Sequence, residues 1–159
     1  MVSRLVGERE TVEIAGEHRF PAPRDVVWEA MLDPAALQAS MPGCERFVEV
    51  GPDSYDLTIK VGMAAIKGTY SGNVKLADVN PKDSYRLVVT GSGKPGSVQG
   101  EATMVLSEDG SGTLVRYTGE VKAQGAIARL GSRLLGGAAK LMIGQFFKGM
   151  EKQVQNRVV

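Results

Sequence analysis

Apolar and polar residues alternate along most of the stretch from Tyr55 to Ala123, and this pattern constrains the fold more than any other feature of the chain. Alternation with a period of two is typical of β-strands that have one face buried and the other in water. Short turns containing glycine, proline, asparagine or aspartate interrupt the stretch, which predicts hairpins and antiparallel pairing. We expect five or six strands, with turns near residues 51–53, 61–65, 80–83, 92–96 and 108–112.

One of the two alternating rows is apolar and is expected to face the interior. It contains all four tyrosines of the chain and five glycines, whereas the other row carries carboxylates and cations. Glycines in a strand can bend the sheet or leave an unfilled space, and the two interpretations are compatible. The pattern predicts an apolar hollow with tyrosine hydroxyls pointing into it. The residues concerned are Tyr55, Tyr70, Tyr85, Tyr117, Gly68, Gly72, Gly91, Gly100 and Gly119.

Helical segments precede and follow these strands. After a first strand over Thr11–Phe20, Pro23 suits the first position of a helix that runs to about Asp33. Asp33 in turn suits the N-cap of a second short helix that ends near Ser40. From Ile127 to about Asn156 the sequence lacks proline and has helical spacing, as in Leu130, Leu134, Ala138, Leu141 and Gln145.

This order of elements predicts an α+β fold in which a curved antiparallel sheet wraps around a long C-terminal helix, with two short helices after the first strand. A helix of about 28 residues is roughly 40 Å long, which is enough to cross the whole sheet. We expect residues 1–159 to form a single domain with a core of about 11–154.

Composition excludes several classes of protein. The 159 residues are 43% hydrophobic and 23% charged, as in globular domains, and a net charge of +1 gives no general attraction to nucleic acid. The N-terminus lacks the features of a signal peptide, no apolar run is long enough to span a membrane, and Cys44 is the only cysteine. We therefore expect a cytoplasmic protein.

The C-terminal stretch from residue 125 to residue 159 is strongly basic, with six basic residues and one acidic residue. A charged stripe on a helix is usually a solvated face, and cations near a helix C-terminus suit the helix dipole. The alternative interpretation is contact with an acidic partner or peripheral contact with an anionic membrane surface.

Groups suited to catalysis or metal binding are scarce. The strand carboxylates Asp56, Glu101 and Glu120 belong to the outward row, and His18 is the only histidine. A lone histidine near the end of a strand is more often a hydrogen-bonded structural residue than a catalytic one. We expect no catalytic residue, no metal site and no cofactor.

The partner expected from these patterns is a hydrophobic small molecule held between the sheet and the long helix. The predicted lining comes from the inward row of the strands and from one side of the helix. Its residues are Leu57, Ile59, Tyr70, Val89, Met104, Tyr117, Leu130, Leu134, Met142 and Phe146.

Several short motifs together resemble the CoxG family, which is named for a subunit of carbon monoxide dehydrogenase, over about Thr11 to Val154. They are Val27-Trp28, Asp33-Pro34, Met41-Pro42-Gly43-Cys44, Gly51 with Asp53-Ser54-Tyr55, Lys67-Gly68-Thr69-Tyr70-Ser71-Gly72, and Gln145-Phe146-Phe147.

The resemblance implies the helix-grip fold of the START-like (SRPBCC), birch-pollen-allergen-like superfamily. It also implies a non-catalytic protein that binds a quinone-like or lipidic molecule and is accessory to a molybdenum-containing carbon monoxide dehydrogenase or related hydroxylase. Some members continue into an apolar C-terminal anchor, whereas this sequence ends at Val159, so we expect membrane contact to be peripheral, at the inner face.

Two other functions stay open at this point. A polyketide cyclase or dehydrase of the same superfamily would need an acid–base pair facing the hollow. A docking or assembly subunit would need a partner surface and no ligand.

Overall fold

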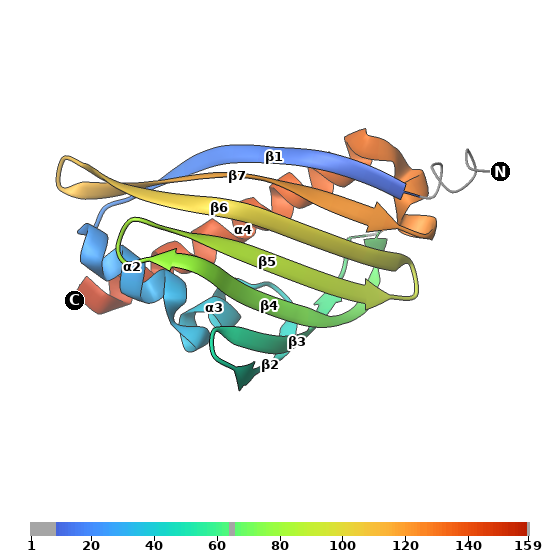
Figure 1. Ribbon diagram of the computed structural model, residues 1–159, viewed down its shortest axis with the longest axis horizontal. Coiled ribbons are helices and arrows are strands. Elements are labelled where there is room, and N and C mark those ends of the chain that lie inside the picture. The colour runs from blue at the N-terminus through green and yellow to red at the C-terminus, as the bar shows by residue number, and fades with distance from the viewer. Residues whose placement is uncertain (1–8, 64–65, 159) are drawn as a thin grey trace.

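The computed structural model describes residues 9–63 and 66–158 (Figure 1). The chain forms β1, two short helices, six further strands, a short 3₁₀ helix and a long final helix. The elements are β1 (Arg9–Phe20), α2 (Arg24–Leu32), α3 (Pro34–Ser40), β2 (Cys44–Gly51), β3 (Ser54–Val61), β4 (Gly68–Asn80), β5 (Ser84–Gly93), β6 (Gly96–Asp109), β7 (Gly112–Gln124), η2 (Ala126–Leu130) and α4 (Gly131–Val158).

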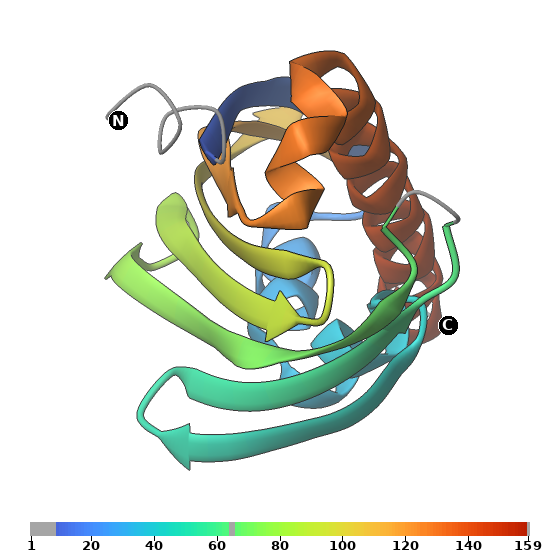
Figure 2. The same ribbon diagram turned by 90° about the vertical axis from the view of Figure 1, so that its right-hand side faces the viewer.

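The strands form one seven-stranded antiparallel sheet in the order β1-β7-β6-β5-β4-β3-β2. Strands β2 to β7 are joined by successive hairpins, and β1 pairs with β7 at the far edge. Helix α4 lies behind the sheet in Figure 1, and the end view in Figure 2 shows the sheet curving around it. The predicted fold class is confirmed: a curved antiparallel sheet, a long C-terminal helix, and two short helices after the first strand.

The starts of the two short helices follow local rules. Asp33 caps α3, because its Oδ1 accepts a hydrogen bond of 3.1 Å from the backbone N–H of Ala35, as predicted. Pro23 lies one residue before its predicted position: it is the N-cap of α2, and its carbonyl accepts hydrogen bonds from Val26 and Val27.

The prediction of one continuous helix from Ile127 is wrong. Residues Ala126–Leu130 form the 3₁₀ helix η2, and α4 begins only at Gly131, whose φ is +85°. A positive φ interrupts a right-handed helix, and a 3₁₀ turn has a different number of residues per turn, so the helical phase is reset at this point. Within α4 the buried residues are Leu135, Phe147, Met150 and Val154, whereas Leu134 and Leu141 face outward.

The core consists of two clusters. The larger joins α2, α3 and the C-terminal half of α4 to the sheet, and its most buried members include Phe20, Tyr85 and Met150. The smaller cluster lies under η2 and the start of α4, and includes Tyr70 and Leu135. These clusters anchor the sheet to α4 at two places along the helix.

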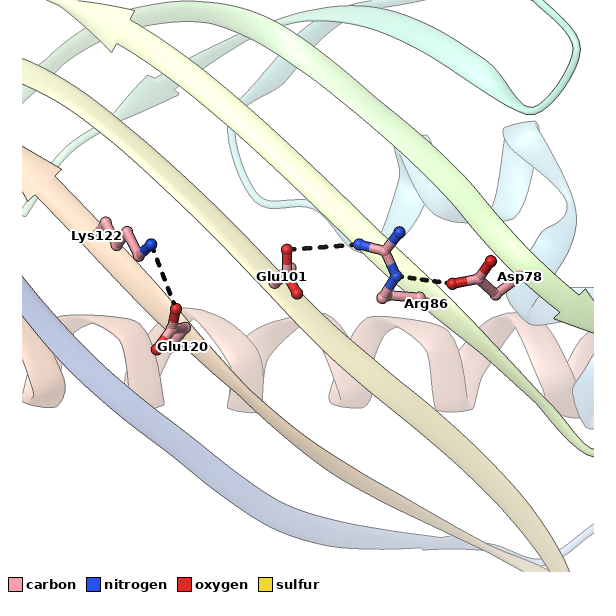
Figure 3. Close-up of polar contacts among 5 residues, drawn as sticks. All are labelled: Asp78, Arg86, Glu101, Glu120 and Lys122. Atoms are coloured by element: carbon pink, nitrogen blue, oxygen red, sulfur yellow. Dashed lines mark hydrogen bonds and ion pairs between the residues drawn. The ribbon is translucent and has the colours of Figure 1, made fainter.

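The outer face of the sheet is polar, as predicted for the outward row. Arg86 lies 2.9 Å from Asp78 and 3.4 Å from Glu101. Figure 3 shows these side chains on the face of the sheet opposite to α4. Lys122 lies 3.6 Å from Glu120 on the same face. Exposed ion pairs contribute at most about 1 kcal/mol each, so their main effect is to keep this face in water.

Candidate ligand-binding cavity

An apolar cavity of about 240 Å³ lies between the inner face of the sheet and α4. Strands β2 to β6, helix α3 with the turn after it, η2 and α4 all contribute to its wall. The lining residues are Leu37, Met41, Pro42, Phe47, Leu57, Ile59, Val61, Ile66, Tyr70, Ser71, Gly72, Val74, Leu87, Val89, Thr90, Gly91, Val98, Ile127, Met142 and Phe146.

Six of the ten residues predicted from the sequence line this cavity. Four come from strands and two from α4, so the structure brings together side chains that are up to 89 positions apart, from 57 to 146. They are Leu57, Ile59, Tyr70, Val89, Met142 and Phe146.

The other four predicted residues lie outside the cavity. Met104 and Tyr117 face each other across β6 and β7 in the packed core, where the Tyr117 ring stacks on Phe147 at 5.5 Å. Leu130 packs against the smaller cluster from η2. Leu134 is 55% exposed, because α4 buries the neighbouring Leu135 in the smaller cluster and adjacent side chains on a helix point about 100° apart.

One side of the cavity did not emerge from the sequence pattern. Leu37 on α3, Met41 and Pro42 in the following turn, and Phe47 on β2 close it at the edge of the sheet. The motif Met41-Pro42 indicated a turn, but its contact with the cavity depends on how far the sheet curves. Nothing in the spacing of residues reports that curvature.

Tyrosine hydroxyls do not point freely into the cavity, contrary to the sequence prediction. Of the four tyrosines only Tyr70 lines it, and its hydroxyl donates a hydrogen bond of 2.7 Å to the carbonyl of Ile66. Burial raises the pKa of Tyr70, so the hydroxyl keeps its proton. Tyr55 stacks on Phe47 at 4.9 Å, and Tyr85 is fully buried against Trp28.

Glycine is present for different reasons at the two inward positions that line the cavity. A Cβ atom added to Gly72 would lie 1.7 Å from the carbonyl oxygen of Thr90, so close approach of the backbone requires glycine there. A Cβ added to Gly91 would lie 3.7 Å from Val98, an ordinary contact. Gly72 therefore permits the strands to pack and bend, whereas Gly91 leaves space that a side chain would fill.

His18 lies outside the cavity and has structural contacts. Its ring stacks on Phe147 at 5.2 Å, meets Phe20 edge-on at 4.8 Å, and its Nε2 is 3.1 Å from Oε2 of Glu151. These contacts favour the interpretation of His18 as a hydrogen-bonded residue that joins β1 to α4.

Cys44 is half-buried at the start of β2, and its thiol donates to the carbonyl of Arg46 at 3.4 Å. Burial raises the pKa of this thiol, which disfavours the nucleophilic thiolate. Among the residues that the structure describes, no cluster of three histidine, cysteine or acidic side chains could hold a metal ion.

A second hollow, of about 640 Å³, lies on the outer face of the sheet. Its wall combines apolar surface with polar and charged side chains, among them Asp56, Gln99 and Lys122, and it shares Leu57, Ser71, Gly72, Thr90, Gly91 and Val98 with the apolar cavity. Because charged groups line this hollow, it suits an apolar ligand less well than the cavity does.

Within residues 9–63 and 66–158, none of the helices has an apolar stretch of the length that crossing a membrane requires. The sheet, the long helix that it grips and the cavity between them define the class of helix-grip proteins. The family model of CoxG, a carbon monoxide dehydrogenase subunit, matches residues 16–155, and the chain belongs to this family.

Solved structures support the same class. A conserved protein from Geobacillus kaustophilus is 32% identical, with a TM-score of 0.88, and the match covers 91% of this chain and 95% of that one. Ara h 8.0201 is 18% identical, with a TM-score of 0.66, over 92% and 99% of the two chains. The Zhui aromatase/cyclase from Streptomyces sp. R1128 is 15% identical, with a TM-score of 0.66, over 94% and 97%. A comparison with curated proteins gives no match.

Proposed function

We propose that this protein is a non-catalytic binding protein for an apolar small molecule, which it holds in the cavity between the sheet and α4. The observation that carries the proposal is the lining: among its described residues Tyr70 is the one titratable side chain, and its hydroxyl is already bonded to Ile66. An acid–base catalyst needs a titratable group that can reach the substrate. We therefore do not extend the proposal to cyclase activity.

The size of the cavity limits what it can hold. An apolar cavity of about 150 Å³ accepts benzene. The 240 Å³ found here suits a ring system somewhat larger than benzene, such as the head of a naphthoquinone, or one folded segment of an isoprenoid chain. A long chain would have to extend out of the cavity.

The partly exposed lining residues indicate where such a chain would leave. Among the lining residues outside the strands, Pro42 is exposed and Met41, Met142 and Phe146 are half-buried, whereas Leu37, Ile66 and Ile127 are buried. We propose that the cavity opens between the turn after α3 and the middle of α4. Methionine side chains adapt readily to different apolar shapes, so Met41 and Met142 suit the edge of an opening through which a ligand passes.

The proposed cellular role rests on family membership. We propose that the protein is accessory to a molybdenum-containing carbon monoxide dehydrogenase or a related hydroxylase, with a quinone or another lipidic molecule as its ligand. The proposed location is the cytoplasm, with peripheral membrane contact through the basic α4. The name of the family supports the enzyme partner, and the apolar lining supports the ligand class.

Binding of menadione, a naphthoquinone, tests the ligand proposal. The protein is purified without detergent, examined by native mass spectrometry and solvent extraction for bound apolar molecules, and titrated with menadione and palmitate by calorimetry. We expect a bound apolar molecule or uptake of at least one probe. Absence of both from well-folded protein would exclude the proposal.

Two variants tie binding to the cavity. Gly91→Leu and Val89→Phe both add side-chain volume inside it, and we expect each to weaken menadione binding about tenfold or more through steric exclusion. Val105→Ser on the exposed outer face is the matched control, and circular dichroism checks that all three variants are folded. Unchanged affinity in both cavity variants would place the ligand elsewhere.

A further inference from the structure

The outward face of α4 carries a regularly spaced stripe that is uncovered in the described chain. Leu134 and Leu141 are 55% and 51% exposed and lie one heptad apart. Gly137, Gly144 and Lys148 fall between and after them at spacings of three and four residues, and all three are exposed. This is the spacing of a coiled-coil contact line. We call these five residues the α4 seam.

The two seam glycines have no packing role inside the described chain. A Cβ atom added to Gly137 or Gly144 would meet nothing within 4 Å, whereas at Gly136 it would meet Val12 at 3.3 Å and at Gly149 it would meet Ser40 at 3.0 Å. Each interior glycine destabilises a helix by roughly 1 kcal/mol relative to alanine. At the seam this cost has no internal compensation, but it allows another backbone to approach closely.

The glycines also create a groove. A hollow of about 630 Å³ follows the seam beside β1. Its wall includes Gly137, Leu141, Gly144 and Lys148 of the seam, together with Lys140, Gln145, His18 and Glu151. Bulky apolar side chains of a second helix would fill it, while Leu134 and Leu141 would insert into the spaces of that helix.

The flanks of the seam are basic. Arg133 and Lys140 lie on one side and Lys152 on the other, and Glu151, the only acid between residues 125 and 159, is hydrogen-bonded to His18. Pairing with a second copy through this seam would bring cations against cations. Acidic flanks on the partner would instead form favourable pairs.

We propose that the α4 seam docks an amphipathic helix of another protein, with bulky apolar residues opposite Gly137 and Gly144 and with acidic residues opposite Arg133, Lys140 and Lys152. A bilayer is attracted by basic and apolar side chains but gains nothing from two glycine notches, so the notches favour a helix. The seam faces away from the cavity residues Met142 and Phe146, and this inference does not rest on the proposed ligand.

Synthetic peptides of about three heptads test the inference. The first peptide has leucine at the contact positions and glutamate at the flanks, the second has lysine at the flanks, and the third has alanine opposite the glycines. Binding is measured by fluorescence anisotropy at low and high salt. We expect the first peptide to bind at least about tenfold more tightly than the others, and its affinity to fall as the salt concentration rises.

Variants of the full chain locate the binding. Leu141→Asp and Gly144→Leu should each weaken binding of the first peptide about tenfold or more. The first substitution removes an apolar side chain that inserts into the partner helix, and the second fills the space that the glycine leaves. Lys140→Glu should weaken binding of the peptide with glutamate flanks and strengthen binding of the peptide with lysine flanks. Val105→Asp, on β6 and 44% exposed, is the control and should change nothing.

Three results would overturn the proposal. The first is equal binding of the acidic and lysine peptides, and the second is full binding by Gly144→Leu. The third is binding of the seam to something other than a helix of another protein. If the parent protein binds vesicles of phosphatidylcholine and phosphatidylglycerol and Leu141→Asp does not, the seam contacts a membrane surface. If the parent protein sediments as a dimer and Leu141→Asp as a monomer, the seam binds a second copy.

Discussion

Gly72 and Gly91 are partners in register across β4 and β5, yet the structure requires glycine at only one of them. We predict that Gly72→Ala destabilises the fold by about 3 kcal/mol, because its Cβ cannot avoid the Thr90 carbonyl oxygen. Gly91→Ala should change the free energy of unfolding by less than about 1 kcal/mol. Urea unfolding of both variants measures this difference, and equal effects would contradict the assignment of the two glycines.

Tyr85 makes stability depend on alkaline pH. Complete burial raises the pKa of Tyr85 above its ordinary value of 10.0. Above that pH the unfolded chain releases this proton while the folded chain retains it, so stability falls as pH rises, by up to about 1.4 kcal/mol per pH unit. Tyr85→Phe removes this contribution, and its stability should therefore fall less steeply from about pH 10 upward.

Urea midpoints of both proteins across that range measure the effect. The difference at pH 7 serves as the baseline, because Tyr85 is neutral there in the folded and the unfolded states. Parallel curves for the two proteins would mean that Tyr85 ionises over the same pH range in the folded and the unfolded states.

Alternation in the sequence predicted which way the strand residues face, and four of the six cavity residues followed from it, while Met142 and Phe146 followed from the predicted helix. It could not predict where along the sheet each side chain lies relative to α2 and α3. These two helices fill one end of the space between the sheet and α4. Met104 and Tyr117 face inward as expected, but at the filled end, where Tyr117 stacks on Phe147. The hydroxyl of Tyr70 was also unpredictable, since its acceptor at Ile66 depends on the path of the chain before β4.

At the scale of elements, the strands and helices followed from local signals, and the phase of α4 did not. Apolar residues continue at helical spacing through Ile127, Leu130 and Leu134, so the sequence favours one helix. The positive φ of Gly131 breaks it into η2 and α4. Glycine permits such angles but does not require them, so the sequence pattern does not predict the break. Leu134 lies in α4 one position before the buried Leu135 and faces the surface instead of the cavity.

The glycines of α4 should respond to substitution in opposite ways. Gly137→Ala and Gly144→Ala should each stabilise the protein by about 0.5–1 kcal/mol, because alanine favours the helix and meets nothing there. Gly149→Ala should be destabilising, because its Cβ would lie 3.0 Å from Cα of Ser40 on α3. Thermal unfolding checks the three variants, and a loss of stability at Gly137 or Gly144 would reveal packing at the seam.

At the scale of the whole molecule, two core clusters fix the sheet to α4 and the cavity touches members of both, from Leu37 to Ile127. This arrangement lets an unfilled space persist, since the packed regions supply the stability that the empty region lacks. An apolar guest would restore the missing contacts without disturbing either cluster.

Thermal unfolding with and without menadione tests whether the space is kept for a guest. At a free concentration of 100 times the Kd, a ligand that binds only the folded state stabilises it by about 2.7 kcal/mol. For a chain of this length, each kcal/mol raises Tm by about 2–4 °C, so we expect a rise of about 5–10 °C. Gly91→Leu should not show this rise, because its side chain occupies the same space.

The stability of the Gly91→Leu variant in the absence of ligand distinguishes a ligand site from an incidental void. Filling a cavity commonly adds about 0.5–2 kcal/mol of stability, so this variant should unfold at a higher temperature than the ligand-free parent while binding less menadione. Stability and binding then change in opposite directions at one residue, as expected where a space is maintained for function. A variant that is less stable and still gains Tm with menadione would show that the cavity at Gly91 is not where the molecule binds.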